Sequence, residues 1–103
     1  MSTTLLLGGN FPVSNSLTTH GQLASSAVGT SVEFSLIHGI GSVTVSVMLE
    51  TDEKETYQNV VVTDEAQTVD IPDGTTYVEF NIQKVVLDDP VESGVFAMNM
   101  WAD

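Results

Sequence analysis

Apolar and polar side chains alternate with a period of two along much of this chain. In residues 42–50 (SVTVSVMLE), three valines and Leu49 fall on one side of an extended chain, and small hydroxyl side chains fall mainly on the other. The segments SVEFSLI and YVEFNIQ repeat the pattern, each with a phenylalanine at the centre of its apolar face. This period predicts half-buried antiparallel strands whose apolar faces form one core. The residues expected there are Phe34, Val45, Val47, Val78, Phe80 and Ile82.

Turn residues separate the alternating segments, as in IHGIGS, ETDEKE, IPDGT and LDDPVESG. The expected strands lie near residues 31–38, 42–50, 56–63, 67–71, 76–87 and 94–101, with one or two shorter strands before residue 31. The 15 valines and 12 threonines favour extended structure, and no window has a helical period. In a chain of 103 residues, short strands with regular turns predict one all-β domain, an antiparallel β-sandwich or a jelly-roll-like barrel.

The N-terminal segment carries no charged side chain before Glu33 and is rich in serine, threonine and glycine. Three interpretations of residues 1–30 are open: a flexible neutral tail, an extended uncharged arm, or an edge segment that supplies the first strand of the domain. We favour the arm, packed on another chain, with residues 31–103 as the β-sandwich domain. The residues expected to bind that partner are Leu5, Leu6, Leu7, Phe11, Val13 and Trp101.

The rest of the chain is acidic: 14 acidic residues against two lysines give a net charge of −12. Such a charge repels phosphates and anionic lipid, so we expect neither nucleic acid nor membrane as a partner. There is no cysteine, no secretory signal and no apolar run of about 18 residues. We therefore expect a protein made in the cytoplasm without a signal peptide.

No stretch of the sequence carries a catalytic signature, and we expect no enzyme, no cofactor and no metal. The acidic stretch ETDEKETYQ lacks the residue order of a calcium loop and predicts a solvated hairpin tip. Asp88, Asp89 and Glu92 are an alternative, weak calcium site. The two histidines, His20 and His38, lie far apart in sequence, and no serine elbow is present.

The last apolar segment, VFAMNMW, has apolar side chains on both faces, which predicts a strand that is central or covered by a neighbour. We therefore expect Trp101 at or near a subunit contact. An alternative use of Trp101, with Tyr57 and Tyr77, is a flat platform for a sugar.

The neutral segment from Ser2 to Ser31, the Val/Thr strands such as SVTVSVML and the apolar last strand together resemble small capsid decoration (cement) proteins and related virion accessory proteins of tailed bacteriophages. The resemblance covers the character of the whole chain and offers no motif to match residue by residue. It implies a non-enzymatic structural protein that decorates or cements a capsid shell through its N-terminal segment.

The same resemblance implies the capsid exterior as location, the major capsid protein or other virion subunits as partners, and a homo-oligomer, with a trimer favoured. The alternative function is a glycan- or receptor-binding β-sandwich module of a phage tail or adhesin.

Overall fold

The computed structural model describes residues 4–15, 21–88 and 93–102, and most of them lie in eight strands. The strands are β1 (Thr4–Ser14), β2 (Gln22–Ser25), β3 (Ser31–His38), β4 (Gly41–Glu50), β5 (Glu55–Val62), β6 (Gln67–Asp70), β7 (Tyr77–Leu87) and β8 (Ser93–Ala102). No helix occurs in these ranges, so the described residues contain none long and apolar enough to cross a membrane.

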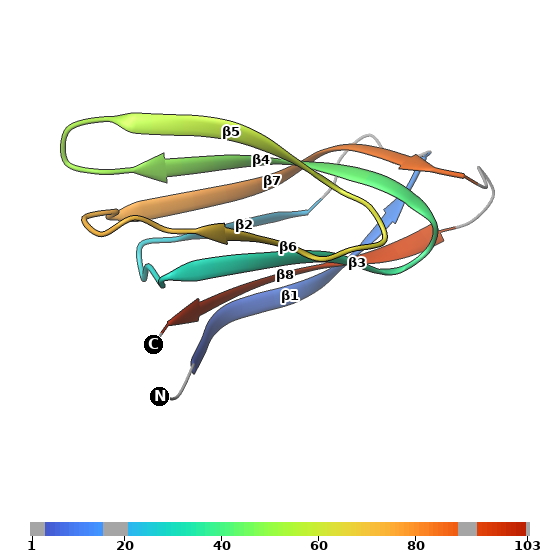
Figure 1. The fold of residues 1–103 in the computed structure, drawn as a ribbon, viewed down its shortest axis with the longest axis horizontal. Coiled ribbons are helices and arrows are strands. Elements are labelled where there is room, and N and C mark those ends of the chain that lie inside the picture. The colour runs from blue at the N-terminus through green and yellow to red at the C-terminus, as the bar shows by residue number, and fades with distance from the viewer. Residues whose placement is uncertain (1–3, 16–20, 89–92, 103) are drawn as a thin grey trace.

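Two four-stranded antiparallel sheets form the molecule, sheet A with the order β1-β8-β3-β6 and sheet B with the order β2-β7-β4-β5. They pack face to face as a sandwich (Figure 1). The all-β prediction is confirmed, and of its two forms the structure has the sandwich. All six strands expected after residue 30 are present, with ends shifted by no more than one residue.

The core lies between the sheets and consists of alternate residues of each strand. Phe34 joins the layers: its ring meets Phe80 of sheet B edge-on, with centroids 5.5 Å apart, and stacks on Phe96 of sheet A at 6.3 Å. The six residues predicted for the core are all buried, which confirms that prediction. The fold therefore rests on apolar packing, without any cysteine in the chain.

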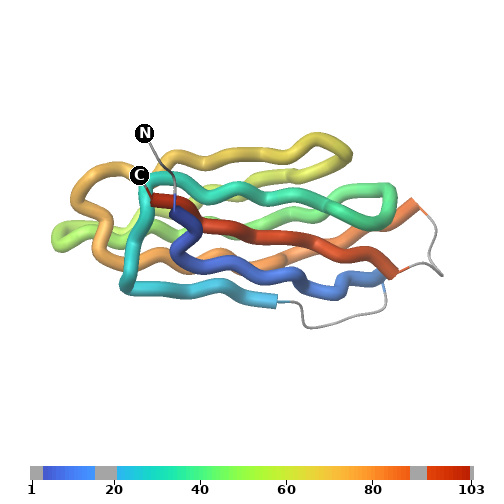
Figure 2. Tube along the Cα trace, turned by 90° about the horizontal axis from the view of Figure 1, so that it is seen from below, coloured from blue at the N-terminus to red at the C-terminus, as the bar shows by residue number. Residues whose placement is uncertain are grey.

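The first strand corrects the favoured interpretation of the N-terminal segment. β1 pairs with β8 from Thr4 opposite Ala102 to Ser14 opposite Ser93, and Figure 2 shows β8 between β1 and β3. Val13 is fully buried in the core. β8 is a central strand of sheet A, with β3 paired along one edge and β1 paired along the other. The structure thus has the alternative, a first strand of the domain's own sheet, in place of an arm.

The end of β1 is fixed to the other sheet by a side chain. The Asn15 amide nitrogen donates a hydrogen bond to the Leu87 carbonyl at 3.1 Å, and its Oδ1 accepts one from the Leu87 N–H at 2.8 Å. The side chain thus pairs with the last residue of β7 as a backbone neighbour would. β2 follows and pairs with β7, so the described residues before 31 belong to both sheets.

Candidate functional site

The outer face of sheet A is almost free of charge. Glu33 and Asp70 are the only charged side chains in its four strands. Because side chains alternate along a strand, the residues between the core positions point outward. We call this surface the neutral face; its members are Leu5, Gly8, Asn10, Pro12, Ser31, Glu33, Ser35, Thr68, Asp70, Val95, Ala97, Asn99 and Trp101.

The outer face of sheet B has a different character. Glu50, Glu55 and Glu79 point outward there, together with Lys84, and the β4–β5 hairpin adds more charge at one end. Within the described residues, most of the acidic charge therefore lies on sheet B and in the turns. The two outer faces differ in the kind of surface that each can contact.

The β1 edge borders the neutral face. It has 11 residues with no charge, whereas edge strands in natural proteins commonly carry lysine or other charges that discourage pairing with another chain. Two features reduce the ability of this edge to pair with another strand. They are a register shift between Leu5 and Leu7, and Pro12, which has no N–H. Leu5 is 48% exposed and Leu6 is 42% exposed. The outer edge of β1, which has no neighbouring strand in its sheet, therefore lies next to exposed apolar side chains.

The six residues predicted to bind a partner divide into two groups. Leu7 and Phe11 pack against the core and Val13 lies inside it, so the fold of the domain itself uses these three. Leu5 and Leu6 are exposed, and Trp101 lies half-buried on the outer face, opposite Leu5. Trp101 is outside the core, and its place in a subunit contact stays a prediction.

A shallow depression of about 330 Å³ is lined by Trp101 together with Ser31, Glu33 and Thr68. The backbone fixes the position of Trp101, because its carbonyl accepts a hydrogen bond from the Thr30 N–H at 2.7 Å. An aromatic face next to hydroxyl and carboxylate groups can stack on a sugar ring and hydrogen-bond its hydroxyls.

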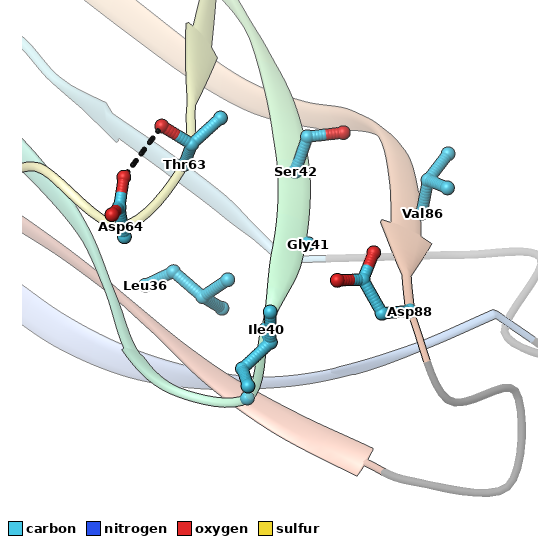
Figure 3. Close-up of a pocket in the computed structure, with 9 residues that line it drawn as sticks. Leu36, Ile40, Gly41, Ser42, Thr63, Asp64, Val86 and Asp88 are labelled. Carbon is cyan, nitrogen blue, oxygen red and sulfur yellow. Dashed lines mark hydrogen bonds between the residues drawn. The ribbon is translucent and has the colours of Figure 1, made fainter.

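A second hollow, drawn in Figure 3, lies beside the β3–β4 hairpin. This hairpin is at the end of the sandwich away from the termini (Figure 1). We call the hollow the end groove; it has a volume of about 390 Å³ and is lined by Leu36, Gly39, Ile40, Gly41, Ser42, Thr63, Asp64, Val86 and Asp88. These residues come from the β3–β4 hairpin, the β5–β6 connection and the end of β7. The expected IHGIGS turn is this hairpin.

Local geometry explains why the groove has this shape. Gly39 (φ 107°) and Gly41 (φ 148°) have backbone conformations that other residues rarely adopt. A side chain on Gly41 would lie 2.1 Å from the Val86 carbonyl oxygen, so only glycine fits there. The Asp88 N–H donates to the Ile40 carbonyl at 2.8 Å and holds the hairpin against the end of β7.

No pattern in the sequence predicted this groove. Asp64, Asp88 and Ile40 come from three separate connections, and no local spacing links them. The one available signal was Ile40 itself, an apolar residue between two turn glycines. The weak calcium alternative also involved this region: Asp88 is exposed at the groove, whereas Asp89 and Glu92 lie outside the described residues.

The acidic tip is a hairpin, as predicted, with Glu50 directly opposite Glu55. Their side chains hydrogen-bond, which is the main reason that the pKa of Glu50 is raised, followed by partial desolvation and by repulsion from Glu55. The Tyr57 hydroxyl donates to Glu55, and this bond raises the pKa of Tyr57. The pair lies on an open surface, and the described residues contain no group of three potential ligands for a metal ion.

Comparison of the chain with protein-family models, with curated proteins and with solved structures found no match.

Proposed function

We propose that this chain is a non-enzymatic structural protein of a virion that decorates or cements a capsid shell through the neutral face and the β1 edge. The observation that carries the proposal is the distribution of charge. In a chain of net charge −12, four strands of one sheet hold only two charged side chains. The resemblance to decoration proteins supplies the shell, its major capsid protein or other virion subunits, as the partner.

Physical chemistry favours this surface as the contact. Burying a carboxylate in an interface is costly unless it is paired, and most of the neutral face avoids that cost. An open strand edge can add a strand from a neighbour and gain main-chain hydrogen bonds. Leu5, Leu6 and Trp101 lie near one end of β1 and provide apolar anchors of the kind that dominate interfaces. The acidic outer face of sheet B then stays in water.

The test is co-sedimentation of the purified chain with capsid shells of the phage that carries its gene. Ser35→Glu places a charge on the neutral face, and Ser46→Glu places the same charge on the outer face of sheet B as a matched control. We expect the unchanged chain and Ser46→Glu to sediment with the shells and Ser35→Glu to remain in the supernatant. Equal binding of both variants, or an unchanged chain that never sediments, would overturn the proposal.

The proposal includes a homo-oligomer, with a trimer favoured by the resemblance. Solution mass measured by light scattering at increasing concentration tests this part separately. If the chain is a monomer both in solution and on the shell, the predicted homo-oligomer is wrong. The proposal that the chain binds the shell would still stand.

A second candidate function is a glycan-binding module, favoured by the depression at Trp101. Trp101 is the only tryptophan in the chain, so its fluorescence reports directly on a saccharide stacked against it. We expect a saturable fluorescence change with a bound saccharide, and loss of retention on immobilised glycan in Trp101→Ala. If no sugar on a broad glycan array is retained, this candidate is wrong.

A further inference from the structure

The end groove exposes apolar side chains that the fold itself does not need to expose. Ile40 is 70% exposed and Val86 is 46% exposed, and both line the groove with Leu36. Removing the exposed part of such side chains from water is favourable in proportion to the apolar area that is covered. A ligand with an apolar portion would therefore be stabilised against them.

Two carboxylates flank this apolar surface. Figure 3 shows Asp64 and Leu36 on one side of the first residues of β4, Asp88 and Val86 on the other side, and Ile40 at the lower end of the strand. Thr63 donates one hydrogen bond to Asp64 at 3.2 Å. Neither lysine lines the groove: Lys54 lies in the β4–β5 hairpin at the opposite end of the sandwich, and Lys84 faces outward opposite Thr44.

The chemistry of the lining narrows the class of ligand. No aromatic side chain lines the groove, so a sugar has no ring to stack on. The described residues hold no group of potential metal ligands here. Phosphates are repelled by both carboxylates and by the net charge of the chain. What fits is an apolar stem with a cationic head, which is the structure of lysine and arginine side chains.

We infer that the end groove binds a lysine or arginine side chain of a partner polypeptide. The stem of that side chain lies against the apolar lining, of which Ile40 is the most exposed residue, and its cationic head is attracted by the carboxylates of Asp64 and Asp88 on either side of β4. The contact is separate from the neutral face, at the end of the sandwich, and it holds whether or not the partner is a capsid shell. The end groove is thus the place where a positively charged partner surface contacts this acidic protein.

The test is a nuclear magnetic resonance titration of the isotope-labelled chain with a capped tripeptide, acetyl-Ala-Arg-Ala-amide. Its control is the same peptide with citrulline in place of arginine, which keeps the shape and removes the charge. We expect saturable shifts of the Ile40, Asp64 and Asp88 amides with the arginine peptide. The citrulline peptide should bind about three- to tenfold more weakly, the range of one or two exposed ion pairs.

Two pairs of variants locate the effect. Asp64→Asn with Asp88→Asn should remove the preference for arginine, whereas Asp52→Asn with Asp73→Asn changes the net charge equally and should keep it. Ile40→Ser should weaken both peptides, whereas Ile37→Ser, next to the groove in the same hairpin, should not. Retained amide spectra show that each variant is folded.

Three results would overturn the inference. Equal binding of the citrulline peptide would remove the role of the carboxylates. If the Asp52/Asp73 variant lost the preference for the arginine peptide to the same extent, the overall charge of the protein would explain that preference. Shifts that spread over the surface without saturation would show that the groove is not a site. None of these results bears on shell binding, which the Ser35 and Ser46 variants test.

Discussion

Phe80 is the side chain of sheet B whose ring meets Phe34 of sheet A, and it is fully buried. Phe80→Ala removes this contact and leaves a cavity that the two sheets cannot close without moving. We expect the free energy of unfolding to fall by about 3–5 kcal/mol, measured by urea denaturation. Gln83→Ala, at an exposed position of the same strand, is the control and should change it by about 0.5 kcal/mol or less. A loss below about 1 kcal/mol for Phe80→Ala would contradict the described core.

Asn15 is a polar residue whose effect on stability comes from its two hydrogen bonds to Leu87. Asn15→Ala leaves the Leu87 N–H and carbonyl without these partners, and we expect a loss of about 1–3 kcal/mol in thermal or urea unfolding. Asn15→Asp keeps the acceptor and loses the donor, so its stability should lie between those of the parent and the alanine variant. If all three proteins have equal stability, water replaces the hydrogen bonds of the Asn15 amide to Leu87 without a loss in the free energy of unfolding.

Glu50 makes stability depend on pH. Its pKa is raised above the ordinary 4.5 because of the hydrogen bond with Glu55, desolvation and repulsion, in that order. The folded state therefore binds this proton more tightly than the unfolded state, and protonation stabilises the fold. We expect the stabilisation to be present at low pH and to be lost as the pH rises from about 4.5 through the raised pKa.

Glu50→Gln should remove this part of the pH dependence, measured as the melting temperature across that range. Glu53→Gln makes the same charge change in the turn of the same hairpin and should retain it. A parent protein whose stability does not decline over this window would show that the two carboxylates do not share a proton.

At the scale of elements, β1 is where the structure and the favoured interpretation of the sequence differ. Deleting residues 4–13 uncovers the long flank of β8 and removes Val13 from the core. We expect the shortened chain to be insoluble or unfolded, tested by expression yield and circular dichroism. The paired substitution Leu5→Thr and Leu6→Thr keeps the strand and should leave the protein folded. A soluble deletion variant with an unchanged melting temperature would instead support the interpretation of this segment as an arm.

Several features of the sequence explain why its pattern did not clearly predict β1 as a strand. The inward residues Leu7, Phe11 and Val13 do alternate, but Leu5 and Leu6 precede them as an unbroken apolar run. The register shift between Leu5 and Leu7 then changes the phase of the alternation at that point. Two glycines at positions 8 and 9 carry no side chain to show a period. The partner strand lies at the other end of the sequence, which local patterns do not indicate.

β3, β4 and β7 were predictable because each has both signals, a clear alternation and a turn at its end, whereas β5, β6 and β8 were indicated mainly by β-branched and apolar residues between turns. The PDG turn before β7 is an example: Gly74 has φ 90°, and the Thr75 N–H donates to the Pro72 carbonyl at 3.3 Å. Propensity, period and turn chemistry agree in these segments, so local reasoning was sufficient.

At the scale of the whole molecule, the charge pattern of the sequence becomes a difference between faces. The sequence divides into a first half with very few charges and an acidic second half, but β8 comes from the second half and is uncharged. It joins β1 and β3 to make the neutral face. The pairing of distant strands determines this surface, so composition could indicate its existence but not its location. The end groove depends in the same way on three connections meeting at one end of the sandwich.

The position of β8 also governs the order in which the chain can fold. It is a central strand of sheet A, with β1 on one side and β3 on the other, and it is synthesised after the other seven described strands. β1 and β3 must therefore wait, unpaired on those edges, until residues 93–102 have left the ribosome. Closure of the sheet joins residues about 100 positions apart, which makes folding slow. During that interval the uncharged β1 segment is exposed to capture by a chaperone or to aggregation.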